Sequence, residues 1–165
     1  MDFTACPAGP EALPLVLQIL KEGAERLQQQ GIDQWQGWHA PDAERLAWLQ
    51  DGLARGEFYL LQADGQTIGM YRYLHADDLY WGPQTVEARY VHSLAVRPAW
   101  AGRGIGQALL QRLFAQAKAE GAACFRLDCV AHNPALRRYY EALGFAAAGE
   151  AALRGQRFTL LERPL

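Results

Sequence analysis

The chain has 165 residues, of which 50% are hydrophobic and 21% charged, a composition typical of one folded globular domain rather than of a disordered segment. Its formal net charge of −2 lacks the basic surplus that nucleic-acid binding usually requires. No apolar run reaches the roughly 18 residues of a membrane span, and residues 1–7 contain no pattern typical of a secretory signal.

The cysteines do not suggest a disulfide framework. There are three, an odd number, and none of them forms a Cys-x-x-Cys pair. Cys124 and Cys129 would fall on opposite faces of one predicted strand. We therefore expect neither disulfides nor a zinc site, predict no metal, and expect a reduced, cytoplasmic protein.

The first half of the chain predicts a short strand, two helices and a hairpin. After an apolar segment at residues 3–6, hydrophobic residues recur every three or four positions and predict a helix that ends near Gly31. The aromatic, glycine-containing residues 32–39 are typical of a loop, and Pro41 begins a second helix. Strands at 58–63 and 67–74 flank Asp64-Gly65, which favours a type I′ turn.

The second half alternates strands and helices. A polar loop at 75–86 precedes a strand at 87–97, a helix from residue 105 to Gly121 and a strand at 124–130. Asn133-Pro134 is a favourable helix start, and Gly144 closes that helix. Two last strands lie near 145–149 and 156–161. This order predicts a mixed α/β (α+β) fold, and the absence of repeats and linkers predicts a single domain over residues 1–165.

Three glycines alternate at Gly102, Gly104 and Gly106, between a β-branched run and a helical pattern. Glycine lets a ligand approach the backbone, and the first N–H groups of a helix bind phosphate well. The turn therefore predicts a phosphate-bearing cofactor held by main chain, unless the glycines only shape the connection.

Two familiar nucleotide-binding motifs fit this turn poorly. A Rossmann fingerprint requires a small residue where Gln107 and Leu109 stand, although Asp128 follows at about the right distance for its acidic residue. A P-loop requires Gly-Lys-Ser/Thr, which the chain lacks. A nucleotide-binding domain of another fold is therefore disfavoured.

Two motifs resemble those of the GNAT N-acetyltransferase superfamily. The segment Leu94-Ala-Val-Arg-Pro-Ala-Trp-Ala-Gly-Arg-Gly-Ile-Gly-Gln-Ala-Leu-Leu110 is similar to its acetyl-CoA motif, Gln/Arg-x-x-Gly-x-Gly/Ala after a strand that ends in valine and proline. The segment Asn133-Pro-Ala-Leu-Arg-Arg-Tyr-Tyr-Glu-Ala-Leu-Gly-Phe145 resembles the second hallmark, in which an Asn precedes a helix with Tyr-Glu-x-Leu-Gly-Phe. Residues 91–150 match well, whereas the first 90 residues match only in element order.

The resemblance implies a central, mostly antiparallel twisted sheet of six to seven strands, flanked by about four helices and splayed at the strand before the glycine turn. It implies acetyl-CoA as co-substrate and direct attack on its thioester by a primary amine of a small molecule or peptide. The cofactor-binding residues that it implies are Leu94, Ala95, Val96, Ala101, Gly102, Arg103, Gly104, Ile105, Gly106, Asn133 and Tyr140. One departure stands out: the Gln/Arg position of the motif holds Ala101, so backbone N–H groups must cradle the pyrophosphate, with Arg103 adding charge.

For catalysis, Tyr140 occupies the general-acid position of the family. With ordinary pKa values of about 10 for tyrosine and 8.5 for a thiol, proton transfer is uphill by about 2 kcal/mol. A pre-placed hydrogen bond could stabilise the leaving sulfur without complete transfer. The family often places a glutamate on the strand before the turn. Neither Tyr90 nor His92 is one, and His92 has a suitable intrinsic pKa for the base.

Other roles stay open. His92 could be a structural, hydrogen-bonded residue, with Glu87 or a more distant carboxylate acting through water as the base. Alternation would place Tyr90, His92, Leu94 and Val96 on one strand face. For a cationic acceptor the candidates are Asp33, Asp77 and Asp78, with Trp35, Trp38, Tyr80 and Trp81 as walls of its site. The tryptophans could instead pack a lid or the edge of the core.

A second class of function is a non-catalytic acyl-CoA-binding module or sensor. The missing Gln/Arg and the missing strand glutamate would allow it, whereas the retention of Tyr140 argues against it. We expect neither a nucleic-acid partner nor a membrane partner. An exposed strand edge would permit a homodimer.

Overall fold

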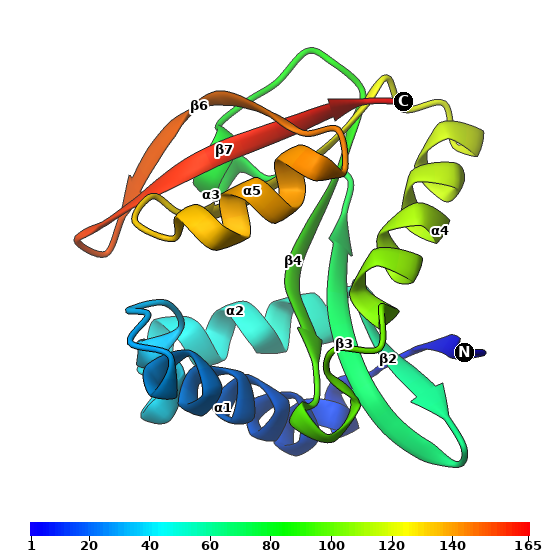
Figure 1. Cartoon of the computed structure of the whole chain (residues 1–165), viewed down its shortest axis with the longest axis vertical. Helices are drawn as coiled ribbons and strands as arrows, with labels where there is room; N and C mark the ends of the chain where they lie inside the picture. Colours follow the sequence, from blue (N-terminus) through cyan, green and yellow to red (C-terminus); the bar gives the residue numbers. More distant parts are fainter. The chain divides into compact units, whose positions relative to one another are not determined.

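The computed structural model describes residues 1–165 and has a mixed α/β architecture (Figure 1). Seven strands form one sheet in the order β1-β2-β3-β4-β5-β7-β6. Strands β1–β2, β2–β3, β5–β7 and β6–β7 pair antiparallel, and β4–β5 pair in parallel. The predicted mixed fold with a mostly antiparallel sheet is therefore confirmed.

The element bounds follow the sequence expectations closely. The strands are β1 (Thr4–Pro7), β2 (Phe58–Ala63), β3 (Gln66–Leu74), β4 (Ala88–Val96), β5 (Cys124–Val130), β6 (Ala146–Leu153) and β7 (Gln156–Pro164). The α-helices are α1 (Leu13–Gln29), α2 (Ala43–Ala54), α3 (Asp78–Trp81), α4 (Ile105–Ala119) and α5 (Pro134–Ala142). Short 3-10 turns occur at Pro10–Ala12, Gln36–His39 and Pro98–Trp100. The short helix α3 lies within the segment expected to be a loop.

The chain divides into two compact units. The first comprises residues 1–73 and 93–108, and the second comprises residues 74–92 and 109–165. Both β4 and α4 contribute residues to each unit, because the boundaries fall after His92 and after Ala108. The expectation of a single domain remains a prediction.

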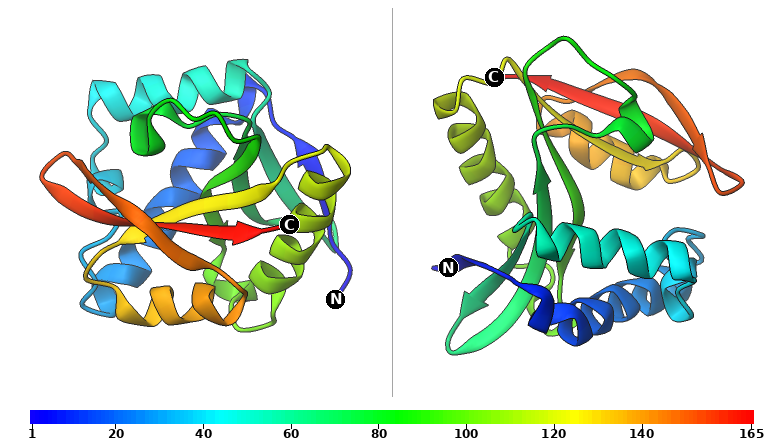
Figure 2. Two further views of the ribbon diagram at one scale, coloured as in Figure 1. Left: turned by 90° about the horizontal axis from the view of Figure 1, so that it is seen from above. Right: turned by 180° about the vertical axis from the view of Figure 1, so that it is seen from behind.

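The first unit is built on α1, α2 and the β2–β3 hairpin. Figures 1 and 2 show α1 and α2 side by side. Its buried core consists of Ala8, Val16, Ile19, Leu20, Leu49, Leu53, Phe58, Met70 and Ala95. The hairpin turn has left-handed backbone at Asp64 (φ 49°) and Gly65 (φ 72°), as a type I′ turn requires. The predicted turn type is therefore consistent with the structure.

The tryptophans of the loop between α1 and α2 are packing residues. Trp35 and Trp38 both lie against the core of the first unit. A Cβ added at Gly23 of α1 would lie 2.8 Å from the Trp35 ring, so glycine there makes room for the indole. This contact favours the packing role for both residues over an exposed cation-binding wall.

The second unit contains β5, β6, β7 and α5, with most of α4. Three phenylalanines pack edge to face or tilted: Phe114 of α4, Phe125 of β5 and Phe145 after α5. The Asn133 side chain accepts a hydrogen bond from the Leu136 N–H at 3.2 Å and so caps α5, as the sequence predicts. This cap fixes where α5 begins and therefore where its later residues point.

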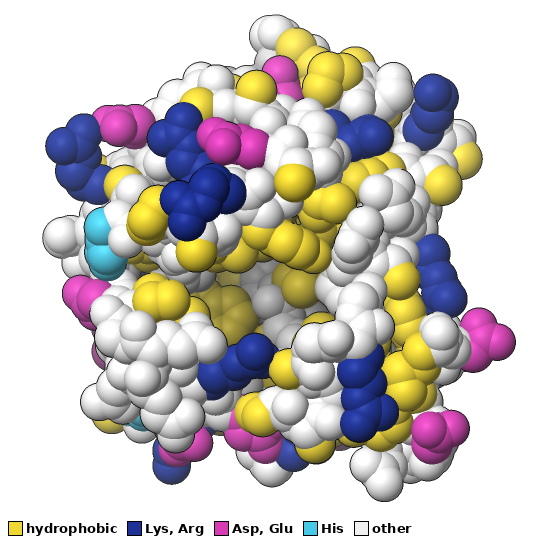
Figure 3. Space-filling model, in the orientation of Figure 1, with side chains coloured by type: hydrophobic (Ala, Val, Ile, Leu, Met, Phe, Trp, Pro, Cys, Tyr) yellow, Lys and Arg dark blue, Asp and Glu magenta, His cyan; other side chains and the backbone are white.

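The surface has no single basic region on the face shown in Figure 3, where Lys and Arg side chains are interspersed with Asp and Glu. None of the helices combines the length and apolar character that crossing a bilayer requires.

Candidate active site

The backbone of β4 changes direction at Ser93. This residue has a φ of 52°, in the left-handed region that non-glycine residues rarely adopt. Before it, β4 pairs with β5 from Ala88 opposite Cys124 to Tyr90 opposite Arg126. Two residues further along both strands, His92 and Asp128 approach each other through their side chains. The alternation expected along β4 is therefore interrupted between His92 and Leu94.

The glycine turn that precedes α4 has the geometry its sequence indicates. Gly102 and Gly104 have φ values of 75° and 73°, and a Cβ added at either would meet nothing within 4 Å. Glycine is required there by backbone conformation and not by crowding. α4 begins at Ile105, directly after the turn, so its first N–H groups have no acceptor within the helix. Open space and unpaired donors fit a phosphate group.

Arg103 and Ala101 complete this turn. The Arg103 guanidinium donates to the carbonyl oxygen of Ala99 at 3.1 Å and lies 4.7 Å from the centre of the Trp100 ring. It is exposed, which leaves its remaining N–H groups in solvent. Ala101 offers only a methyl group, so any pyrophosphate contact there comes from the main chain.

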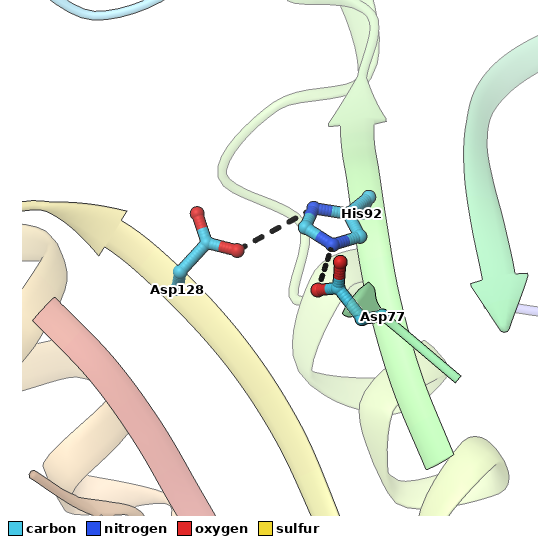
Figure 4. A group of neighbouring side chains, drawn as sticks. All are labelled: Asp77, His92 and Asp128. Atoms are coloured by element: carbon cyan, nitrogen blue, oxygen red, sulfur yellow. Dashed lines mark hydrogen bonds and ion pairs between the residues drawn. The ribbon is translucent and has the colours of Figure 1, made fainter. Parts of the chain in front are cut away.

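His92 lies between two carboxylates that come from different segments (Figure 4). Its Nε2 is 2.7 Å from Oδ2 of Asp77, and its Nδ1 is 3.4 Å from Oδ2 of Asp128. Asp77 caps α3, where its Oδ1 accepts from the Tyr80 N–H at 3.3 Å, and Asp128 belongs to β5. The Tyr80 ring lies over His92 with its centre 4.9 Å away. We call Asp77, His92 and Asp128 the histidine cluster.

The histidine cluster is well shielded from solvent. The side-chain exposure is 5% for Asp77 and 10% for His92 and for Asp128. Oδ2 of Asp128 is buried and has no hydrogen-bond donor. Burial raises the pKa of Asp128 to about 6, with the Asp77 charge adding to the rise and His92 opposing it. A buried carboxyl that titrates near neutrality is well suited to proton transfer.

The cluster also contains the ligand types of a metal site, and its three donor atoms lie within 4.8 Å of one another. The two carboxylates, however, contact opposite nitrogens of one imidazole ring. A metal ion binds one ring nitrogen at about 2 Å, so the ion could not lie beside both carboxylates without a rearrangement. The arrangement fits proton sharing better than metal binding.

Tyr140, the predicted general acid, lies on α5 in the second unit. Its ring packs against Tyr139 at 5.4 Å and Phe145 at 5.7 Å between ring centres. Burial raises the pKa of the Tyr140 phenol above its ordinary value, with further contributions from Tyr139, Cys129 and Asp128. The phenol therefore stays protonated near neutral pH and is available as a hydrogen-bond donor.

A second polar group lies two residues before the histidine cluster on the same strands. Arg126 of β5 donates to Glu162 at 2.7 Å, to the Tyr90 hydroxyl at 2.8 Å and to Gln84 at 3.1 Å. Its guanidinium also lies 4.5 Å from the centre of the Trp81 ring. We call this group the arginine cluster. Because the Trp81 ring packs against the Arg126 guanidinium, its contact favours a packing role for Trp81.

The structure separates the three aspartates that the sequence offers for a cationic acceptor. Of the three aspartates considered for a cationic acceptor, Asp77 joins His92, whereas Asp33 and Asp78 are exposed. Sequence reasoning considered Asp128 only as a dinucleotide ligand and missed its place beside His92. A usable signal was available, because two strands joined through one helix often pair in parallel, and each of these strands carries an ionisable residue near its end.

Comparisons with known proteins agree with this architecture. The model of the Acetyltransferase (GNAT) family matches residues 22–145. The uncharacterised N-acetyltransferase YesJ of Bacillus subtilis is 29% identical over 91% of this chain and 85% of its own length. An L-methionine sulfoximine/L-methionine sulfone acetyltransferase of Pseudomonas aeruginosa is 30% identical over 70% of this chain and 66% of its own length.

Solved structures show the same fold. A GNAT family acetyltransferase from Listeria monocytogenes superimposes with a TM-score of 0.79 at 20% identity, covering 100% of this chain and 96% of that one. The PaiA N-acetyltransferase from Thermoplasma acidophilum, in complex with coenzyme A, gives a TM-score of 0.74 at 17% identity over the full length of both chains.

The family model and the named relatives identify an acetyltransferase. The chain belongs to the GNAT family of acetyltransferases. This membership favours the enzymatic prediction over a non-catalytic acyl-CoA sensor.

Proposed function

We propose that this enzyme transfers the acetyl group of acetyl-CoA to a primary amine of a small molecule or peptide. The observation that carries the proposal is the turn before α4, where two left-handed glycines open directly onto a helix N-terminus. The coenzyme A complex of the PaiA enzyme and the named acetyltransferase activity of the Pseudomonas aeruginosa relative support it.

The cofactor contacts in this proposal are mostly main chain. Backbone N–H groups from Gly102 to Gly106, including that of Ile105, cradle the pyrophosphate, and the exposed Arg103 adds positive charge. Residues Leu94 to Val96, which follow the distorted Ser93, offer backbone groups to the pantetheine arm. Asn133 contributes through its cap of α5, which positions Tyr140.

Acetyl-CoA supplies an acetyl group activated as a thioester. Tyr140 donates a hydrogen bond that stabilises the sulfur as the carbon–sulfur bond breaks, without complete proton transfer, because its raised pKa makes that transfer more uphill. His92 takes the proton that the amine nitrogen must lose before it can form the new carbon–nitrogen bond. Each role requires the group to reach its reacting atom in the correct protonation state, and burial keeps the Tyr140 phenol protonated near neutrality by raising its pKa.

Thiol release measured with acetyl-CoA and a panel of primary amines tests the activity, and calorimetry tests cofactor binding. We expect Tyr140→Phe to bind acetyl-CoA normally but to lower kcat by about 10²- to 10⁴-fold, the usual contribution of general acid–base catalysis. Unchanged turnover would exclude Tyr140 as the acid. Absence of acetyl-CoA binding to the unmodified enzyme at high micromolar concentration would exclude the proposed function.

The turn is tested separately with Gly104→Val, which we expect to abolish acetyl-CoA binding, because a β-branched residue is strained at a φ of 73°. Gly121→Val at the end of α4 is the matched control. Gly121 also has a left-handed φ, 87°, and open space around it. The control carries a similar backbone cost and should retain cofactor binding. Loss of binding in both variants would show a general folding defect instead.

A further inference from the structure

The proton positions in the histidine cluster can be assigned from its hydrogen bonds. Oδ1 of Asp77 accepts from the Tyr80 N–H, and Oδ2 of Asp77 lies 2.7 Å from His92 Nε2, within hydrogen-bond distance. Because an ionised carboxylate can only accept, Nε2 of His92 carries the proton of that bond. In the neutral imidazole the lone pair is then on Nδ1, which is the basic nitrogen and faces Asp128.

Asp128 meets this basic nitrogen with a second acceptor. Its Oδ2 lies 3.4 Å from Nδ1, is buried, and has no hydrogen-bond donor. Buried polar atoms are normally paired, because an unpaired one costs free energy. A proton held between Nδ1 and Oδ2 would give the buried Oδ2 of Asp128 a partner.

We propose that Nδ1 of His92 and Oδ2 of Asp128 together form the site that receives the proton of the acceptor ammonium, and that Asp77 is a positioning residue that keeps the other proton on Nε2. The N–H bond of the ammonium breaks, its electron pair stays on the nitrogen that attacks, and the proton binds Nδ1 and is shared with Oδ2. This inference rests on the proposed function and replaces a lone histidine base with a two-atom acceptor.

The charges around the cluster are consistent with this role. The other titratable groups near it are Tyr80 of α3, Tyr90 of β4, Cys129 of β5 and Tyr140 of α5. Burial raises the pKa of Cys129 to about 11 and that of Tyr140 above its ordinary value, so both stay neutral near pH 7. With both carboxylates ionised, the cluster carries a charge of −2 before it receives the proton and −1 afterwards, which favours a cationic amine.

Nitrogen NMR of ¹⁵N-histidine-labelled enzyme tests the assignment without any mutation of the site and without turnover. We expect the neutral His92 ring to carry its proton on Nε2 and Nδ1 to be the nitrogen that gains a proton as the pH falls. In Asp128→Asn the Nδ1 pKa should fall relative to that of the unmodified enzyme, because the carboxylate that stabilises the imidazolium is gone. A neutral ring protonated on Nδ1 would overturn the proposal.

The pH dependence of kcat/KM tests the catalytic part. Asp128→Asn should lower kcat by about 10²-fold or more and shift the acidic limb to lower pH, while Asp128→Glu, which keeps a carboxylate, should restore much of both. Asp77→Asn should lower kcat by about tenfold or more through loss of tautomer control. The matched control Asp64→Asn removes an exposed charge from the hairpin turn and should leave both quantities unchanged.

The outcomes separate the two proposals. If the pH dependence of kcat/KM in Asp128→Asn is the same as in the unmodified enzyme, Asp128 has a structural role and the proton-sharing site is overturned, even if kcat is lower. If the unmodified enzyme releases no thiol with any amine while its His92 tautomer is as expected, the proposed acceptor class fails and the proton-binding pair stands. If an Asp128 variant does not bind acetyl-CoA or does not fold, the NMR measurement on the unmodified enzyme decides.

Discussion

The arginine cluster and the histidine cluster occupy successive positions on the same two strands and differ in how their ionisable group on β5 is partnered; each cluster also contains one unpaired buried atom, Trp81 Nε1 in the first and Asp128 Oδ2 in the second. Tyr90 and Arg126 are direct partners in the β4–β5 register, and His92 and Asp128 follow two residues later on each strand. Arg126 has carboxylate, amide and phenol acceptors and an aromatic ring beneath it. Asp128, by contrast, keeps a buried oxygen without a donor.

The contacts of Arg126 stabilise its buried charge, whereas the burial of Asp128 costs free energy when its carboxyl is ionised. In the arginine cluster each named contact lowers the free energy of the buried charge. In the histidine cluster burial disfavours the charged form of Asp128 and raises its pKa to about 6. An acid that the fold destabilises and yet holds in place is more useful for moving protons than for stability.

The largest effect on stability is expected from Arg126→Met, which removes the arginine cluster but keeps the volume of the side chain. Loss of one partner of a buried ion pair costs about 3 to 5 kcal/mol, and the lower end applies because Glu162 retains 35% exposure. Urea denaturation measures the loss. The acidic limb of kcat/KM should stay in place, and a shift of that limb would show that the two clusters are not separate in function.

Asp128→Asn should change stability in the opposite direction at neutral pH. The folded pKa is raised from 3.8 to about 6, so the unfolded chain ionises first as the pH rises, and wild-type stability falls between about pH 4 and pH 6. Above pH 6 the accumulated cost is at most about 3 kcal/mol. Asparagine does not ionise, so the variant should be more stable than wild type at pH 8 and equal to it near pH 3.5. An equal gain at both pH values, measured by urea denaturation, would refute the burial argument.

A smaller loss is expected from Tyr90→Phe, which removes only the hydroxyl that accepts from Arg126. One N–H of a buried guanidinium then loses an acceptor, at a cost of about 1 to 2 kcal/mol. Thermal unfolding of Tyr90→Phe, Arg126→Met and the double variant measures the coupling between the two residues. Additive losses would mean that this hydrogen bond contributes nothing to the cluster.

The smallest effect is expected from Arg103→Ala, because Arg103 is exposed on the glycine turn and its charge is screened. The affinity for acetyl-CoA should fall by less than about tenfold, which corresponds to roughly 1 kcal/mol. Calorimetry at two salt concentrations measures it. A larger loss would mean that the side chain, and not the main chain, provides the main phosphate contact.

Local signals allowed much of the fold to be predicted. The Asp64-Gly65 turn requires two left-handed residues, and both are found. The Asn133 cap and the glycine turn before α4 likewise depend on residues within one turn of the chain. Such features are encoded by neighbours in sequence, so a single chain is enough to find them.

The histidine cluster could be predicted only in part, because its members come from three segments. His92 was found from its chemistry, but Asp77 is 15 residues away and belongs to a segment expected to be a loop. The short helix α3 turns that loop so that its capping residue also reaches the imidazole. Whether a buried oxygen has a donor depends on packing from distant segments, which periodicity and spacing do not contain.

The left-handed backbone at Ser93 should restrict which residues occur at position 93 in related sequences. A serine can hold a φ of 52° at a modest cost, glycine at almost none, and asparagine or aspartate more easily than most residues. For valine and isoleucine the conformational free energy of this backbone is much higher, although their preference for strands would otherwise favour them at such a position. Related sequences that keep the geometry beside His92 should therefore have small or polar residues at position 93 and rarely β-branched ones. The residue preference at this strand position should resemble that of a turn.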